Sequence, residues 1–334
     1  MADSSGCATI VLVARDDVDL VGGAVASLLA QEGGPYSILL IDDGSVDGTW
    51  DRINEVVAAT PGHGHRVRTS RSPESMGAGR LIRAIEQLKT PYAVIARPED
   101  RSRPDRMERL VHAIETTGAP VITSNRTRIG GSVIEHASGA NRTGSGPVDA
   151  REIAFHLGGT ATPLGTMAIR SDAVRSFPTL NGARLGEELG PLFGFRGAIL
   201  GGCYYLDETL VDFKQVRDGN GLDVRSRETC REGLFANLIA SRTGMLQDLR
   251  DLRQRQDSRE LDTSLVHLEA SLKGVLIELV ERWTHAREEL WNRDMRPCWV
   301  TERELEAANN SVERLRPRSL LGRVREALGR SRAA

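Results

Sequence analysis

The chain has 334 residues and is 40% hydrophobic, which is enough apolar material for one large core or two modest ones and excludes a disordered protein. Lysine and arginine number 44 against 46 aspartates and glutamates, so the formal net charge is -2. This balance excludes a global electrostatic footprint for nucleic acid, and we expect no nucleic-acid partner.

The cysteines and the N-terminus indicate the cellular compartment. Cys7, Cys203, Cys230 and Cys298 lie far apart without a C-x-x-C pair, which argues against a disulfide framework or a zinc site. The first seven residues lack the basic start and apolar core of a signal peptide, and no later stretch has the length of an uncharged membrane span. We therefore expect a cytoplasmic protein, with any membrane contact confined to its surface.

The first half of the chain alternates strand and helix patterns. Short β-branched runs predict strands, and the amphipathic stretches between them predict helices. The expected strands are 8–14, 37–41, 66–69, 92–96 and 121–124, and the expected helices are 18–29, 50–57, 79–88 and 104–116. This order predicts a Rossmann-like α/β domain with a mainly parallel sheet and helices on both faces.

The middle of the chain departs from this alternation. Residues 125–149 are rich in Gly, Ser, Thr, Asn and Arg, which predicts a loop or an insertion. The pattern then predicts a helix at 151–157, a strand at 166–170 and short strands at 198–200, 204–206 and 210–213, as in the antiparallel end of an α/β domain.

The last third of the chain carries only helical patterns. We expect an α/β domain at residues 1–220 and a helical domain at 221–334. Spacings of four and three predict one apolar helix stripe, which the shorter series Leu246, Leu249 and Leu252, a second subunit or its own domain would cover. The stripe consists of Leu261, Leu265, Leu268, Leu272, Val275, Leu279 and Trp283.

The tail at residues 314–332 interleaves seven arginines with apolar residues. This pattern is typical of a basic amphipathic helix at an anionic membrane surface, which predicts peripheral contact with the inner face of the membrane. A solvated helix or a contact with a partner explains the pattern equally well.

Acidic residues follow the second expected strand, in the run from Ile41 to Thr49. In an open α/β sheet, ligands bind outside the carboxyl ends of the strands, so Asp42 and Asp43 should face a ligand crevice. Gly44 and Gly48 permit a tight turn, and the Asp side chains and Ser45 can bind nearby N–H groups. Taken alone, the run is also typical of an ordinary Asx turn or a surface metal loop.

The whole opening, from Val11 to Thr49, resembles that of family-2 inverting glycosyltransferases of the A-type (GT-A) fold. It contains a strand, a helix with Ser-Leu-Leu-Ala-Gln at 27–31, a second strand and Asp-Asp-Gly-Ser-x-Asp-Gly-Thr. The resemblance extends over about residues 8–213. It implies a nucleotide-diphosphate sugar as donor and a glycan, lipid-linked or protein acceptor. Apart from the resemblance, we expect the helical domain to pack on the α/β domain, to mediate self-association or to shape the acceptor site.

In that family, the fourth strand ends in an Asp-x-Asp type signature, followed by Pro-Asp-Arg. This chain keeps Pro-Asp-Arg at 104–106 but has Arg97 at the first acid, with Glu99 and Asp100 at the metal-binding acid. The resemblance thus implies a divalent ion, Mn²⁺ or Mg²⁺, held by Glu99 or Asp100. Arg97 offers a second reading, in which a cation neutralises the diphosphate. A third is a simple surface pair of Arg97 with an acid.

The resemblance also implies a catalytic base in an acidic pair at the start of a helix, which here is Glu187-Glu188. Glu188 takes the position of the base, which removes the acceptor hydroxyl's proton during in-line attack on the anomeric carbon. Two acids also favour a helix N-terminus for electrostatic reasons alone.

Two further segments are expected at the donor. Ala14 and Arg15 end the first expected strand, beside the crevice that would bind the nucleotide base. Gly79 and Arg80 lie in a glycine loop suited to binding a phosphate.

Two rival functions remain open. A binding or scaffold protein of the same fold would have lost turnover, consistent with the altered acidic motifs. A sugar nucleotidyltransferase shares the fold, but it usually has a glycine-rich basic loop after the first strand, where this chain has Val13-Ala14-Arg15-Asp16.

Overall fold

The computed structural model describes residues 7–61, 63–129, 134–135, 144–155, 162–177, 189–214, 228–255 and 259–292. One compact unit spans Met1–Arg282, and a second spans Trp283–Ala334. The sheet and the site described below belong to the first unit. No helix in these ranges is both long and apolar enough to cross a bilayer.

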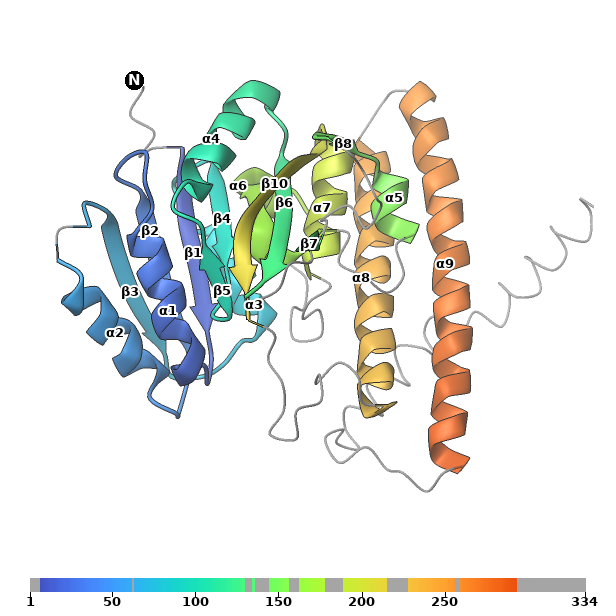
Figure 1. Ribbon diagram of the computed structural model, residues 1–334. Coiled ribbons are helices and arrows are strands. Elements are labelled where there is room, and N and C mark those ends of the chain that lie inside the picture. Colours follow the sequence, from blue (N-terminus) through green and yellow to red (C-terminus); the bar gives the residue numbers. More distant parts are fainter. Residues whose placement is uncertain are drawn as a thin grey trace, which may run out of the picture. The chain divides into compact units, whose positions relative to one another are not determined.

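The first unit is built on a sheet of ten described strands, whose main path runs β3-β2-β1-β4-β9-β6-β10-β5 (Figure 1). Neighbouring pairs from β3 to β4, and β6 with β10, are parallel, while β9 runs against both β4 and β6. The carboxyl ends of β1, β2, β3, β4, β6 and β10 therefore meet at one edge of the sheet. The strands are β1 Ala8–Ala14, β2 Ser37–Asp43, β3 Arg66–Ser72, β4 Tyr92–Ala96, β5 Asp100–Ser102, β6 Val121–Arg128, β7 Ile134–Glu135, β8 Gly146–Val148, β9 Met167–Arg170 and β10 Cys203–Phe213.

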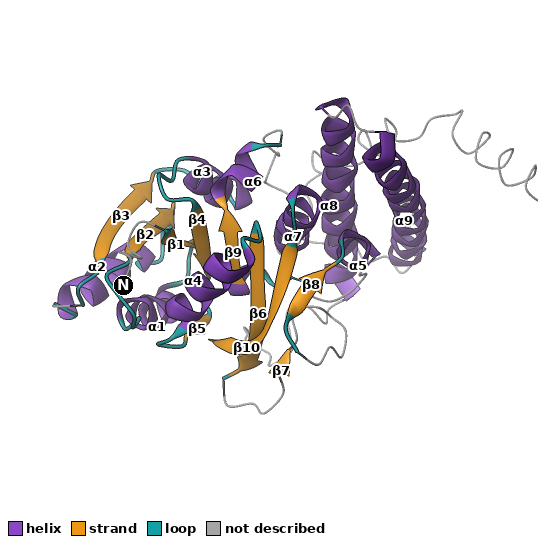
Figure 2. Ribbon diagram, turned by 90° about the horizontal axis from the view of Figure 1, so that it is seen from above, coloured by secondary structure: helices purple, strands orange, loops and turns teal. Residues whose placement is uncertain are grey.

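Helices cover both faces of the sheet, as the alternation predicted (Figure 2). Side chains alternate between the faces of a strand, so Ile10 and Leu12 pack with α1, α2 and α4, whereas Val11 packs with α3, α6 and α7. The helices are α1 Val18–Leu29, α2 Thr49–Ala59, α3 Ala78–Glu86, α4 Arg106–Thr117, α5 Ala150–Phe155, α6 Ser171–Arg175, α7 Leu189–Leu200, α8 Glu228–Arg255 and α9 Arg259–Asn292.

The expected strand at 198–200 is wrong, because these residues end helix α7. The helix is apolar and buried around most of its circumference, so it has no amphipathic period and a short segment of it resembles a buried strand. Helix α7 packs closely against its neighbours at Gly190, Gly194 and Gly197. A Cβ at Gly194 would lie 2.8 Å from Thr162 Oγ1, and one at Gly197 would lie 2.5 Å from Val121 Cγ2.

The expected loop at 125–149 is also partly wrong. Strand β6 continues to Arg128, β7 pairs with β6, and β8 pairs with β10. Polar residues in these strands are stabilised by specific bonds: Asp207 on β10 accepts hydrogen bonds from Asn125 Nδ2 at 3.0 Å and from Gly144 N at 2.9 Å. Sheet pairing and this network thus replace the apolar burial that the composition lacks.

The part of the α9 stripe from Leu265 to Leu272 is covered within the chain. Leu265, Leu268 and Leu272 belong to the same buried cluster as Leu249 and Leu252 of α8, and this cluster continues into the sheet. Self-association through these helices stays a prediction, as does the domain boundary near residue 220, since 215–227 lie outside the described residues. The basic tail at 314–332 lies outside them as well.

A buried ion pair joins α8 to α7. Arg196 Nε lies 2.7 Å from Asp248 Oδ2 and Nη2 lies 3.1 Å from Oδ1, with both side chains 1% exposed. The guanidinium also lies over the ring of Phe177, 4.8 Å from its centroid. Two parallel hydrogen bonds compensate for the desolvation of both charges, so removal of one partner leaves an uncompensated buried charge.

We expect Asp248→Ala to lower the free energy of unfolding by about 3–5 kcal/mol, because it leaves the charge of the buried Arg196 without this carboxylate. Urea unfolding followed by circular dichroism measures this loss. The control is Glu55→Ala, which breaks an Arg52–Glu55 pair of similar length, 2.6 Å, between exposed side chains. That variant should lose no more than about 1 kcal/mol. Equal losses in the two variants would contradict the role given to the buried pair.

Candidate functional site

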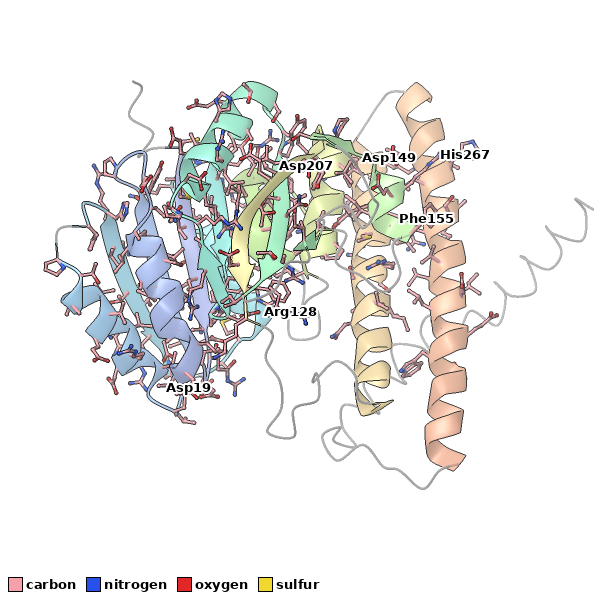
Figure 3. The ribbon with its side chains drawn as sticks, in the orientation of Figure 1. Asp19, Arg128, Asp149, Phe155, Asp207 and His267 are labelled. Carbon is pink, nitrogen blue, oxygen red and sulfur yellow. The ribbon has the colours of Figure 1, made fainter. Side chains whose placement is uncertain are left out.

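A cavity of about 450 Å³ opens at the edge where the parallel strands end. Figure 3 marks this edge by Asp19, at the start of α1, and Arg128, at the end of β6, whereas Asp207 lies toward the opposite edge. The cavity is lined by Val13, Ala14, Arg15, Asp17, Asp43, Gly77, Ala78, Leu81, Ile95, Ala96, Arg97, Pro98, Glu99, Leu164, Leu189 and Asn237. Of the predicted site residues, Ala14, Arg15, Asp43, Arg97 and Glu99 are therefore brought together.

The loops after β1 and β2 are tied to each other by side-chain hydrogen bonds. Asp16, which has a φ of 52°, donates its N–H to Ser45 Oγ at 3.0 Å, and its carboxylate accepts from Val46 N at 2.9 Å. Asp17 N–H donates to Thr49 Oγ1 at 2.7 Å. Ser45 is buried in this network, so the structure places it behind the cavity wall and gives it the bond to a nearby N–H that the motif predicted.

Asp42 and Asp43 point to opposite faces of the sheet, because successive residues of a strand alternate. The Asp42 side chain is fully buried and pairs with Arg71, with 3.2 Å between Nε and Oδ2. It does not line the cavity, whereas Asp43 does. The sequence motif predicted that both acids line the crevice, but because side chains alternate along the strand, only Asp43 lines the cavity.

Asp43 anchors the segment between β3 and α3. Its carboxylate accepts hydrogen bonds from Ser75 Oγ at 2.8 Å, Met76 N and Gly77 N at 2.9 Å each, and Arg80 Nε at 2.8 Å. Burial raises the pKa of Asp43, but these donors outweigh it and hold the pKa below its usual value. The acid is thus ionised and fixes the cavity wall at Gly77 and Ala78.

Arg80 and Gly79 do not line the cavity. Arg80 bonds Asp43, Ser72 and the carbonyl of Glu74, and it lines a second cavity of about 360 Å³ with Arg68 and Arg83. The structure therefore gives Arg80 a position from which it holds the loop through Asp43.

Arg97 and Glu99 form an ion pair just after the carboxyl end of β4. Arg97 Nη2 lies 2.7 Å from Glu99 Oε1, and the two side chains are 24% and 15% exposed. The carbonyl of Glu99 accepts from Lys214 N at 2.8 Å, which fixes its backbone beside the end of β10. The acid thus orients a guanidinium at the cavity, so the pair considered from the sequence does form, and it lies in the cavity wall.

Asp100 is enclosed and does not line the cavity. Its side chain lies against Gly165, close to the buried Arg106 and Arg126, and its oxygens accept no hydrogen bond from the described residues. Burial raises its pKa to about 7, and the nearby arginines oppose that shift. Arg106, the last residue of Pro-Asp-Arg, donates to Ser102 Oγ at 2.8 Å, Ile95 O at 2.8 Å and Gly165 O at 2.7 Å.

The residues at the predicted metal position do not fit a divalent cation. Such an ion needs several hard oxygen ligands that also reach the diphosphate. Glu99 is paired with a guanidinium, and Asp100 is enclosed behind the wall. The residues that the structure describes contain no group of three or more His, Cys, Asp or Glu that could hold a metal.

Two polar lining residues, Asp17 and Asn237, were missed from the sequence. Asp17 follows β1, and its carboxylate accepts from Arg15 N at 2.9 Å; burial and the nearby Glu99 raise its pKa. The acidic run after the first strand was a signal for it. Asn237 lies on α8, far along the chain, and no sequence pattern connects it with the cavity. The predicted catalytic Glu187 and Glu188 lie outside the described residues.

Comparison with known proteins identifies the family that this site resembles. Residues 9–174 match Glycosyl transferase family 2. The chain is 30% identical over 118 residues to "Succinoglycan biosynthesis protein ExoO" of Rhizobium meliloti (strain 1021), which covers 35% of this chain and 32% of that protein. The match therefore spans about a third of the length of this relative.

Solved structures share the fold at low sequence identity. S. aureus TarS 1-349 in complex with UDP-GlcNAc has a TM-score of 0.57 at 13% identity, covering 87% of this chain and 76% of that chain. The mannosyltransferase PcManGT from Pyrobaculum calidifontis, in complex with GDP-Man and Mn²⁺, has a TM-score of 0.50 at 12% identity, covering 91% and 79%. These likenesses confirm the predicted GT-A fold.

We expect Asp43→Asn to lower the free energy of unfolding at pH 7 by about 2–3 kcal/mol, because it removes charge-assisted hydrogen bonds. The folded-state pKa is lowered, so this stabilisation is present above the unfolded pKa of about 3.9 and is lost as pH falls through the folded value. Urea unfolding between pH 7 and pH 3 should show the two proteins converging below about pH 4.

The control for this prediction is Ser75→Ala, which removes one neutral donor to the same carboxylate. It should cost about 1 kcal/mol and keep the pH dependence of the wild type. A constant difference between wild type and Asp43→Asn across this pH range would contradict the ionised anchor.

Proposed function

Through residues 9–174 the chain belongs to glycosyl transferase family 2, and from this premise we propose that it transfers a sugar from a nucleotide-diphosphate donor to an acceptor hydroxyl with inversion. The observation that carries the proposal is the cavity of about 450 Å³, in which the ends of β1, β2 and β4 bring Arg15, Asp43 and Arg97 together. Ligand pockets in proteins commonly have volumes of about 300–1,000 Å³ and a small number of polar groups in their walls. A ligand of nucleotide size therefore fits this cavity.

The lining divides into parts suited to different parts of the donor. Val13, Ala14, Leu81 and Ile95 supply an apolar floor for a flat base, while Arg15 and Arg97 supply positive charge for phosphates. Leu189 of α7 and Asn237 of α8 also line the cavity, and this supports a role for these helices beside the transferred sugar or the acceptor. UDP-GlcNAc and GDP-Man in the two structural neighbours support a donor of this class.

In the reaction we propose, Glu188 acts as general base. It takes the proton of the acceptor hydroxyl while that oxygen forms a bond to the anomeric carbon, and the bond between this carbon and the phosphate oxygen breaks. The nucleoside diphosphate leaves with the electron pair. The acceptor, whether a glycan, a lipid-linked sugar or a protein, and the site of action in the cytoplasm stay predictions.

We expect a nucleoside diphosphate or its sugar ester to raise the melting temperature by about 4 °C at a hundredfold excess over its Kd, since preferential binding at that ratio adds about 2.7 kcal/mol. A thermal-shift panel of UDP, GDP, ADP, CDP and dTDP and their sugar esters measures this. A panel without any shift would contradict a nucleotide-sugar site.

The matched controls for the panel are two Phe substitutions. Ala78→Phe places a ring in the cavity wall and should abolish the shift. Val46→Phe changes a side chain that is 92% exposed and outside the lining, so it should keep the shift. The same response from both variants would show that the ligand binds elsewhere.

We expect Glu188→Gln to lower turnover by about 10²–10⁴ without weakening the donor's thermal shift, because only proton transfer is lost. The assay is release of nucleoside diphosphate from the best donor of the panel, and proton NMR of the product reports the anomer. Glu208→Gln, which alters a surface pair with Arg109, is the control. Donor binding without any turnover by the wild type would favour the binding-protein alternative.

A further inference from the structure

We propose that Arg97, oriented by Glu99, binds the donor's diphosphate in place of a divalent cation, so that donor binding is independent of metal. This inference rests on the proposed function and specifies how the site neutralises the negative charge of its ligand. The argument depends on which groups line the cavity and on what each of them already binds.

Two guanidinium groups reach the cavity from neighbouring strands. β1 and β4 are paired in parallel with Leu12 opposite Ala96, so Arg15, which follows β1, and Arg97, which follows β4, both leave the sheet at the same edge. Both line the same cavity. Arg15 is held there by a hydrogen bond of 3.0 Å from Nη1 to Ser75 Oγ, which itself donates to Asp43. Arg15 also lies 3.6 Å from Asp16, between Nε and Oδ2, and its side chain is 57% exposed, so Arg97 is the more restricted of the two cations.

The carboxylates of the cavity wall are already engaged by the protein. Asp43 binds the loop and Arg80, Asp17 accepts from the backbone of Arg15, and Glu99 pairs with Arg97. A divalent cation that entered here would have to displace these donors. Its binding would also face repulsion from the two guanidinium groups that line the cavity.

The Arg97–Glu99 pair suits a positioning role. At 2.7 Å, and with both side chains largely buried, the pair restricts the long Arg97 side chain before the diphosphate arrives. A guanidinium has five N–H donors in a planar fork and can bind a carboxylate and a phosphate together. Leu164 completes the wall beside Arg97, which lowers the local dielectric and strengthens the contact with an anion.

A backbone hydrogen bond within the turn after β4 fixes the main chain at Arg97. Asp100 N donates to Arg97 O at 3.1 Å, and the adjacent Asp100 side chain is enclosed against Gly165 instead of facing the ligand. Gly165 in turn accepts from the buried Arg106. The segment thus presents one cation to the cavity and withdraws the acid that a metal would need.

The test is isothermal titration of the purified full chain with UDP and GDP, once in EDTA and once in MnCl₂. We expect the Kd of the better nucleotide to differ by less than about threefold between the two buffers. Arg97→Gln should weaken binding in EDTA by tenfold or more, the loss of one charge-assisted contact. A wild-type Kd more than tenfold weaker in EDTA would overturn the inference and leave the proposed function intact.

Two further variants separate charge neutralisation from general effects. Arg103→Gln removes a nearby arginine that pairs with Asp212 and does not line the cavity, so it should bind as the wild type does. Glu99→Gln loosens the Arg97 side chain, so it should weaken binding by a similar factor in EDTA and in MnCl₂, whereas loss of a metal ligand at this position would weaken binding at least tenfold in MnCl₂ alone.

Failure of the inference and failure of the proposed function give different results. Unchanged EDTA binding by Arg97→Gln would overturn the inference alone, as would a tenfold loss in Glu99→Gln confined to MnCl₂. Absence of binding by both nucleotides in both buffers would overturn the proposed function and this inference together. The melting temperature of each variant without ligand shows whether that variant is folded. The comparison of the wild-type Kd in EDTA and in MnCl₂ does not depend on any variant.

Discussion

The carboxylate of Asp43 is the interaction on which the candidate site depends. It stands at the last residue of β2 and accepts hydrogen bonds from the segment before α3 and from Arg80 on that helix. A parallel strand loses its ladder partners where it ends, so the emerging loops need side chains to fix them. Asp43 provides this for one wall of the cavity, and the Asp16–Ser45 and Asp17–Thr49 bonds provide it for the neighbouring loops.

The Pro-Asp-Arg segment has a second structural role, below the cavity. Arg106 is buried and binds the carbonyls of Ile95 and Gly165 together with Ser102, so it joins β4, β5 and the turn before β9. Burial lowers its pKa to about 10, which still leaves it charged at neutral pH, and Asp100 beside it opposes that shift. The motif therefore shapes the wall that carries Arg97 and does not itself reach the ligand.

The helical extension takes part in the same architecture. The Arg196–Asp248 pair and the shared cluster of Leu249 with Leu272 attach α8 and α9 to the sheet core, and Asn237 of α8 reaches the cavity. A helix that is held by a buried ion pair keeps such a residue in a defined position. The cavity is thus lined in part by a residue that lies outside the family match at 9–174.

The sequence by itself determined the order of strands and helices through β6, except for the short strand β5, and the two acidic segments at the ends of β2 and β4. It could do so because these are local patterns: the periodicity of β1 and α1 gave their bounds, and glycines with positive φ at 44 and 48 allow the predicted turn. The same reasoning mistook part of α7 for a strand, because a helix buried on all sides has no local period.

Only the tertiary structure decided what each side chain of those motifs does. The pleat turns Asp42 into the core and Asp43 toward the cavity wall, and burial encloses Asp100 while leaving Glu99 to pair with Arg97. Asn237 reaches the same cavity from a helix more than a hundred residues further along the chain. These outcomes depend on long-range packing, and neighbours that are distant in sequence carry no signal in a local pattern.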